Sequence, residues 1–279
     1  MIYQNTDLKN AFKEYLTIKY NAHKNPPVLY VVQVGEDAVS AKYVAMKQKM
    51  AQSLGSELVW KTFPSGAQER EVKEEVKAIP SKDGLIYQLP IPEKFQGLVA
   101  TIRPELDVDL LGNNFAAMEK QGILPPTIGA IDLLLKAMCE PNKDINIEEL
   151  LTSTLSLRGV TVGVVGQGVL VGGPVVRYLL AREATIVSVN EYTKQAQELI
   201  STCEVVICGA GKPGLITKAW LKKDAIVIDA ATSESGQGLR GDVDLEKIWE
   251  GNIVSTTPRG VGGLTVLYLF YNLLLLNKI

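Results

Sequence analysis

The sequence predicts a two-domain α/β protein, in which each domain is built on a parallel sheet. Three observations predict this class. Short apolar runs typical of buried strands alternate with helical segments along the chain, the order that parallel sheets require. A glycine-rich turn follows one of these runs and opens a helix. With 279 residues, 46% of them hydrophobic and 22% charged, the chain has enough apolar surface for two ordinary domains.

The first domain is predicted to alternate helices and strands. Apolar residues at helical spacing come first, and a buried strand follows Pro26-Pro27. Pro90 and Pro92 end the third strand, because proline has no N–H to donate to a sheet. Helices are predicted at residues 7–20, between Asp37 and Gly55, and at residues 67–79; strands are predicted at residues 28–34, 57–63 and 84–89.

Residues 103–127 break this pattern with Pro, Gly and Asn, so they are predicted to carry function or to separate domains. The apolar helix predicted at residues 128–138 then links to the second domain. There the strand predicted at 160–166 runs into the glycine-rich turn, and a helix follows through Leu180. Further strands are predicted at 184–189, 205–208, 225–229 and 253–255, before a buried terminal helix that includes residues 264–276.

Strand, glycine-rich turn, helix and strand in this order form the dinucleotide-binding unit. The glycines Gly166, Gly168 and Gly172 allow the backbone to approach a pyrophosphate at the helix N-terminus, where free N–H groups favour anions. The alternative is a tight turn with no ligand. Glu191 follows the second strand and is suited to accept hydrogen bonds from ribose hydroxyls and to repel a 2′-phosphate. Its alternative is an ordinary surface glutamate.

Composition excludes several classes of function. The net charge is −2 and the basic residues are scattered, so neither nucleic acid nor a membrane is expected as a partner. His23 is the one histidine, so no metal site is expected. Cys203 and Cys208 are predicted to be small core residues, and the three cysteines without a C-x-x-C pair favour a reduced, cytoplasmic protein. No signal peptide is expected at the N-terminus.

One helix face carries a row of polar groups. Ser40, Tyr43 and Lys47 are spaced i, i+3 and i+7, which places a hydroxyl, a phenol and an amine on one side of a helix. By itself this pattern also fits an amphipathic surface helix. A site requires polar partners from elsewhere in the chain. Gln88 at the predicted end of a strand and Asp109 in the following loop are candidates.

Seven segments, in order, resemble motifs of one enzyme family. They are Ser40-x-x-Tyr43-x-x-x-Lys47, Gln88-Leu89-Pro90-Ile91-Pro92, Pro104 to Leu110, Pro125 to Ile128, Gly166 to Pro174, Ala210 to Gly214 and Pro258 to Thr265. In this set the chain resembles the bifunctional methylenetetrahydrofolate dehydrogenase/cyclohydrolase family, nearly from end to end. The chain departs from the family's motifs at Leu110, Gln167, Gly168, Arg259 and Gly263, and residues 190–193 replace the family's motif after the second strand of the second domain.

The resemblance implies oxidation of 5,10-methylenetetrahydrofolate by hydride transfer to NAD or NADP, and hydrolysis of the methenyl product to 10-formyltetrahydrofolate. It implies catalytic roles for Lys47, Gln88, Tyr43 and Asp109. Substrate-binding residues are expected at Ser40, Tyr43, Leu89, Pro90, Asp109, Pro258, Gly260, Gly262 and Thr265. Cofactor-binding residues are expected at Gly166, Gln167, Gly168, Val171, Gly172, Pro174, Glu191, Ala210 and Gly211. Because Gln167 and Gly168 replace Arg and Ser of the family's cofactor loop, NAD is favoured over NADP.

The resemblance also implies the organisation of the chain. Residues 1–124, rejoined by the C-terminal helix at 259–279, are expected to bind folate, and residues 125–258 to form the Rossmann-like domain. The site is expected in the cleft between them. A homodimer through the second domain is expected. The alternatives are a member with only one activity, another two-domain dehydrogenase resembling shikimate dehydrogenase, and a non-catalytic nucleotide-sensing module.

Overall fold

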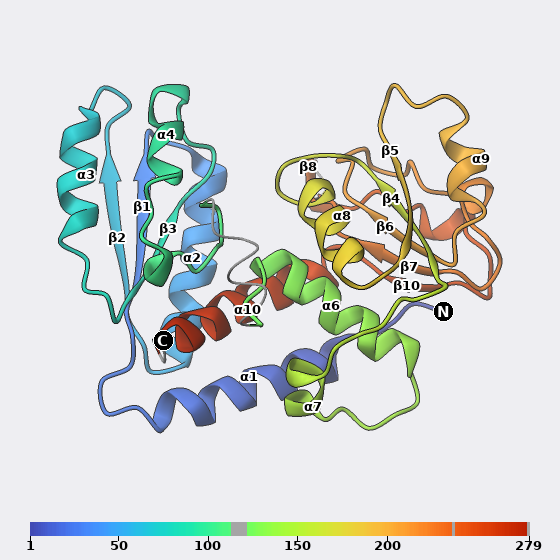
Figure 1. Ribbon diagram of the computed structural model, residues 1–279, viewed down its shortest axis with the longest axis horizontal. Helices are drawn as coiled ribbons and strands as arrows, with labels where there is room; N and C mark the ends of the chain where they lie inside the picture. Colours follow the sequence, from blue (N-terminus) through green and yellow to red (C-terminus); the bar gives the residue numbers. More distant parts are fainter. Residues whose placement is uncertain (113–121, 236–237, 278–279) are drawn as a thin grey trace. The chain divides into compact units, whose positions relative to one another are not determined.

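The chain divides into two units, each with its own parallel sheet (Figure 1). The computed structural model describes residues 1–112, 122–235 and 238–277. Unit 1 contains Met1–Phe12 and Thr127–Thr265, and unit 2 contains Lys13–Pro126 and Val266–Ile279. Helices α1 (Thr6–Asn21) and α10 (Val261–Leu276) contribute several residues to each unit, and the first residue of α6 (Pro126–Cys139) belongs to unit 2 while the rest belong to unit 1.

Unit 2 contains a three-stranded parallel sheet in the order β2-β1-β3. The strands are β1 (Leu29–Val34), β2 (Leu58–Phe63) and β3 (Gly84–Tyr87). The connecting helices are α2 (Ala38–Ser53) and α3 (Glu69–Lys77), and the chain then forms η1 (Glu93–Phe95), α4 (Gln96–Val99) and η2 (Pro104–Leu106). Apolar residues of α3 and of the segment from η1 to η2 pack with Val32, Val34, Leu85 and Tyr87 from the sheet.

The final helix completes unit 2. A Cβ at Gly84 would lie 2.6 Å from both Leu273 Cδ1 and Val108 Cγ1, so α10 packs closely against strand β3. Asn272 is fully buried and donates to the carbonyls of Val108 (2.9 Å) and Leu124 (2.8 Å). Because buried backbone carbonyls require partners, this side chain fixes the chain on both sides of residues 113–121, which lie outside the described residues.

Unit 1 contains a five-stranded parallel sheet in the order β10-β7-β6-β4-β5. The strands are β4 (Thr161–Val165), β5 (Thr185–Val189), β6 (Val205–Cys208), β7 (Ile226–Asp229) and β10 (Ile253–Ser255). Its other elements are α6 (Pro126–Cys139), α7 (Ile147–Thr152), α8 (Gly172–Ala181), α9 (Ala196–Ile200), η3 (Lys218–Trp220), η4 (Leu245–Lys247) and the hairpin β8 (Ser233–Ser235) and β9 (Gly238–Arg240). Strand β5 lies on one side of β4, and β6, β7 and β10 follow one another on its other side. This change in the direction of strand order at β4 is typical of Rossmann-like sheets.

The N-terminus extends one edge of this sheet. Ile2 forms a parallel bridge with Val254 of β10, and Tyr3 N–H donates to the Val254 carbonyl at 2.8 Å. The first residues therefore lie in unit 1, although the functional division at residues 124 and 258 stays a prediction. Cys203 and Cys208 are buried in the core of this unit, as predicted. No helix of the described residues is long and apolar enough to cross a membrane.

Candidate functional site

Helix α2 presents the predicted row of polar residues. Asp37 lies at the N-cap with φ −149° and ψ 119°, and its carboxylate accepts from Ser40 N–H at 2.6 Å. This cap satisfies one of the free N–H groups of the first turn and so fixes where the helix begins. Ser40 is buried, whereas Tyr43 and Lys47 are half-buried, so the row is partly enclosed by unit 2.

The end of strand β3 meets this row through a chain of hydrogen bonds. Lys47 Nζ donates to Gln88 Oε1 at 2.8 Å. Gln88 Nε2 and Ser40 Oγ both donate to the Leu89 carbonyl, at 3.0 and 2.9 Å. The Leu89-Pro90 peptide is cis. Thus the structure brings Ser40 and Lys47 of α2 together with Gln88 and Leu89, which follow more than forty positions later. The roles of these residues stay predictions.

Lys47 and Asp109 influence each other's protonation. Burial lowers the pKa of the Lys47 amine, and the charge of Asp109 opposes this effect. Burial raises the pKa of the Asp109 carboxyl, and the charge of Lys47 opposes that effect. The neutral amine is therefore more accessible here than in a solvent-exposed lysine. A basic amine beside a carboxylate is suited to proton transfer.

A second aspartate shapes the loop that carries Asp109. Asp107 is buried, and its carboxylate accepts from Leu111 N–H at 3.2 Å and Gly112 N–H at 2.7 Å. Leu110 has φ +53°, a left-handed conformation that costs about 1–2 kcal/mol for a residue with a Cβ. Burial raises the pKa of Asp107 to about 6, against the opposing backbone donors. Asp107 therefore holds the loop in place.

In unit 1 the glycine-rich turn has glycines where the backbone leaves no room for a side chain. Gly166 has φ +98°, and a Cβ at Gly172 would collide with the carbonyl of Gly166. Helix α8 begins at Gly172 without a side-chain cap at Val171, and Gly173 N–H donates to the Gly168 carbonyl at 3.0 Å. A Cβ at Gly168 would meet nothing within 4 Å. The open turn and this helix terminus fit the pyrophosphate of a dinucleotide. Pro174 lies in the first turn of α8, where its missing N–H costs nothing.

Polar residues gather around the end of strand β5. Gln167 donates through Nε2 to Ser188 Oγ at 3.0 Å and accepts from Asn190 Nδ2 at 2.8 Å. Glu191 is exposed, and Lys212 Nζ lies 3.7 Å from its Oε2 atom. Lys212 was not among the site residues predicted from the sequence. Its position after strand β6, whose end lies at the same sheet edge as that of β5, was the available signal.

The other predicted substrate-binding residues lie in unit 1. They are Pro258, Gly260, Gly262 and Thr265. The Thr257-Pro258 peptide is cis, and a Cβ at Gly260 would lie 2.6 Å from Ser255 Oγ. Gly262 has open space beside it. Thr265 Oγ1 donates to the Val261 carbonyl at 3.0 Å within α10, so this hydroxyl is used inside the helix.

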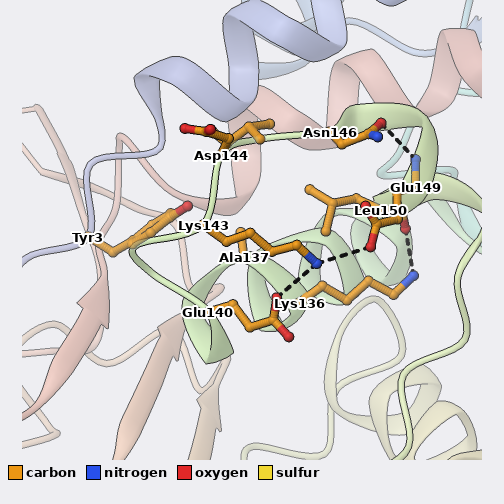
Figure 2. A pocket seen from close by; sticks show the side chains of 10 residues that line it. Tyr3, Lys136, Ala137, Glu140, Lys143, Asp144, Asn146, Glu149 and Leu150 are labelled. Atoms are coloured by element: carbon orange, nitrogen blue, oxygen red, sulfur yellow. Dashed lines mark hydrogen bonds and ion pairs between the residues drawn. The ribbon is translucent and has the colours of Figure 1, made fainter.

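A shallow hollow beside α6 and α7 is lined by none of the predicted site residues (Figure 2). Lys143 Nζ lies 3.1 Å from Glu140 and 3.0 Å from Glu149, and Lys136 lies 2.6 Å from Asp132 and donates to the Leu150 carbonyl at 2.7 Å. These charges are paired within the protein, so the hollow is a structural feature. In the parts of the chain that the structure describes, no group of three or more His, Cys, Asp or Glu could hold a metal ion.

Two family models match these units in sequence. The catalytic-domain model of tetrahydrofolate dehydrogenase/cyclohydrolase matches residues 4–109, and the NAD(P)-binding-domain model of the same family matches residues 139–279. The chain belongs to the tetrahydrofolate dehydrogenase/cyclohydrolase family. This confirms the resemblance drawn from the motifs and the expectation of a nicotinamide cofactor.

Sequence relatives span almost the whole of this family member. Bifunctional protein FolD 2 from Desulfitobacterium hafniense is 30% identical over 276 residues, covering 96% of this chain and 92% of the relative. Bifunctional protein FolD from Staphylococcus carnosus is 32% identical over 264 residues, covering 90% of this chain and 87% of the relative.

Solved structures of the family share the fold. The bifunctional FolD methylenetetrahydrofolate dehydrogenase/cyclohydrolase from Campylobacter jejuni is 23% identical, with a TM-score of 0.85 over 100% of this chain and 98% of that one. The Trypanosoma brucei enzyme, solved with NADP cofactor and an inhibitor, is 24% identical, with a TM-score of 0.82 over 100% of this chain and 97% of that one. The predicted two-domain α/β fold with parallel sheets is therefore confirmed.

Proposed function

We propose that the chain oxidises 5,10-methylenetetrahydrofolate to the methenyl form and hydrolyses that form to 10-formyltetrahydrofolate. Its sequence relatives are named bifunctional FolD proteins. The observation that carries the proposal is the hydrogen bond from Lys47 to Gln88. Lys47 lies on the same helix as Ser40 and Tyr43, and its amine interacts with the charge of Asp109. Residues 1–124 with 259–279 are the proposed folate-binding part, and residues 125–258 are the proposed nucleotide-binding part.

For the oxidation, the residues of the chain mainly bind and orient. A bound nicotinamide supplies the hydride acceptor. The Asp109 carboxylate is suited to accept two hydrogen bonds from the amino group and ring N–H of a pterin, which lie side by side. The Tyr43 ring supplies an apolar face for stacking on the folate. These contacts fix the methylene carbon, and positioning of this kind is what hydride transfer requires of a protein.

For the hydrolysis, Lys47 moves protons. Water adds to the methenyl carbon, and the neutral Lys47 amine accepts the proton that the water loses. The new hydroxyl then loses its proton to solvent as the carbonyl forms and the bond from this carbon to N5 breaks. N5 takes up the proton held by the Lys47 ammonium, which leaves the formyl group on N10 and Lys47 neutral. Gln88 Oε1, which accepts from Lys47 Nζ at 2.8 Å, orients the amine for both transfers. The lowered pKa of Lys47 favours the neutral form that the first transfer needs.

NAD is the proposed cofactor. The carboxylate of Glu191 lies after strand β5, where it would accept from ribose hydroxyls and repel a 2′-phosphate. Gln167 and Gly168 bring no charge to the turn. Lys212, 3.7 Å from Glu191, is the one charge in this group that opposes the preference. Relatives differ in this respect, because the Trypanosoma brucei structure holds NADP and a Saccharomyces cerevisiae structure is named as NAD-dependent.

A homodimer in the cytoplasm is the proposed state. Strand β5 is one edge of the five-stranded sheet, and its Ile186 and Val187 are half-buried, whereas Ile2 covers part of the opposite edge at β10. An edge strand with apolar side chains is a common surface for association. The three free cysteines are consistent with a reducing compartment.

The test compares Lys47→Met with wild type in both reactions, using NAD and NADP in turn. We expect the rate of methenyl hydrolysis to fall by about 100-fold or more, because the variant lacks the proton acceptor. The rate of cofactor reduction should fall much less, since hydride transfer depends on positioning. Lys49→Met, an exposed position on the same helix, is the matched control. Equal loss of both reactions, or of neither, would exclude the role assigned to Lys47.

A further inference from the structure

We infer that Asp242 is a positioning residue for the dinucleotide, acting through the loop after strand β6. Both oxygens of its carboxylate accept from this loop. Oδ2 accepts from the N–H groups of Ala210 at 2.7 Å and Gly211 at 3.3 Å. Oδ1 accepts from Lys212 N–H at 2.7 Å. Three successive backbone groups are thus gathered on one side chain. The inference rests on the proposed binding of a dinucleotide by this unit.

Asp242 is itself held rigidly. Its side chain is fully buried, and its own N–H donates to Asp229 Oδ1 at 3.1 Å. Asp229, at the end of strand β7, also accepts from Val243 N–H at 3.0 Å and Ala231 N–H at 3.2 Å. A buried carboxylate costs free energy unless hydrogen bonds offset it, and here backbone donors do so. The two aspartates therefore connect the ends of β6 and β7 to the segment that follows β9.

The loop held by Asp242 forms one side of the glycine-rich turn. A Cβ at Gly166 would lie 2.7 Å from the Gly209 carbonyl oxygen and 3.0 Å from Ala210 Cα. A Cβ at Gly209 would lie 2.8 Å from Val171 Cγ1. The two backbone segments are therefore in close contact, and a shift of a few tenths of an ångström in one moves the other.

The same loop also carries the charge next to Glu191. The backbone N–H of Lys212 is fixed by Asp242, and its Nζ lies 3.7 Å from Glu191 Oε2. Asp242 thus acts on both ends of the proposed nucleotide site, the pyrophosphate turn and the ribose acid. Its carboxylate oxygens are occupied by the N–H groups of this loop. Its effect on binding passes through residues 209–212.

The test measures the Kd of NAD by calorimetry for wild type and Asp242→Asn. The asparagine keeps one acceptor oxygen and places a donor NH₂ against a backbone N–H. We expect the Kd to rise about tenfold, the effect of losing one hydrogen bond to a charged acceptor. Methenyl hydrolysis, which needs no dinucleotide, should stay within about twofold of wild type and serves as the measure of an intact folate-binding part.

Asp244→Asn is the matched control. Asp244 lies two residues away, accepts from Glu246 N–H at 3.3 Å and pairs with Lys247 at 2.9 Å. It undergoes the same chemical change in the same segment, away from the loop at 210–212. We expect its NAD Kd to equal that of wild type. A role of Asp242 in stability alone would lower the Tm and leave the Kd of NAD unchanged.

A second variant covers the case in which Asp242→Asn does not fold. Asp229→Asn replaces one of the two oxygens that accept from the N–H groups of Asp242 and Val243, and it keeps the Asp242 carboxylate. We expect the Kd of NAD to rise about threefold. If wild type binds NAD and these variants bind it equally well, the inference is wrong. If wild type binds neither NAD nor NADP, the proposed function fails and takes the inference with it.

Discussion

At the scale of single residues, burial and the charge of Asp109 act in opposite directions on the pKa of Lys47. Burial lowers the pKa of the amine, and the Asp109 carboxylate is what opposes this. On the proposed function, a pterin that occupies the carboxylate weakens this opposition, and a methenyl cation beside the amine lowers its pKa further. Substrate binding would therefore favour the neutral Lys47 amine, which is the form that accepts a proton from water.

Asp107 predicts a measurable pH dependence of stability. Burial raises its pKa from 3.8 to about 6, so ionisation costs more in the folded chain than in the unfolded one. The stability that Asp107 contributes is present below pH about 4 and is lost as the pH rises through about 6. Relative to Asp107→Asn, which cannot ionise, wild type should lose about 2 kcal/mol of unfolding free energy between pH 4 and pH 6.

Urea unfolding of both proteins between pH 4 and pH 7 measures this difference. Asp144→Asn, at an exposed position, provides the control for the same chemical change away from this loop. If the difference between wild type and Asp107→Asn also stays constant, the carboxyl of Asp107 titrates as an ordinary aspartate and the argument from burial fails.

At the scale of elements, the sequence predicted what local patterns determine. The strands at residues 205–208 and 253–255 lie where they were predicted, because short apolar runs between turns mark buried parallel strands. The helical spacing of Ser40 and Lys47 predicted that they share one face of a helix, and Gln88 was predicted to lie at the end of a strand. The prediction that Gln88 lies close to this helix face also required the resemblance to the family.

Other elements had no such signal. Helices α7 and α9 and the hairpin of β8 and β9 were not predicted, because they are short and depend on contacts made elsewhere in the chain. The role of Asp242 was missed for the same reason. Its partners lie about thirty residues earlier, and an aspartate between glycine and valine resembles a turn residue.

The turn before α8 gives a prediction at this scale. In Gly172→Ala the new Cβ meets the carbonyl of Gly166, which is backbone and cannot move alone. We expect a loss of about 1–3 kcal/mol of unfolding free energy, as for other overpacked sites, together with weaker binding of NAD. Gly168→Ala adds the same methyl group where nothing lies within 4 Å, so it should leave the Tm unchanged. Thermal unfolding of the two variants tests this prediction. Equal Tm values for Gly172→Ala and Gly168→Ala would contradict the expected collision at Gly172.

At the scale of the whole molecule, the two ends of the chain complete units that the middle begins. Residues 1–12 join unit 1 through backbone bonds to β10, and residues from Val266 join unit 2. The apolar helix near the C-terminus was predicted from its composition. The membership of the first residues was not, because backbone pairing of Ile2 and Tyr3 with Val254 leaves no periodic pattern in the sequence.

Unit 2 should therefore depend on the last helix for its stability. Leu273 is fully buried and lies where a Cβ at Gly84 of strand β3 would be 2.6 Å from its Cδ1 atom. In Leu273→Ala we expect a loss of about 2–5 kcal/mol, because the side chain leaves a cavity against the sheet. Hydrogen exchange of the amides of β1 and β3 measures the loss in unit 2 directly. Leu275→Ala, at a half-buried position on the same helix, should cost less. If the two variants expose these amides equally, the packing of α10 on β3 does not hold unit 2 together.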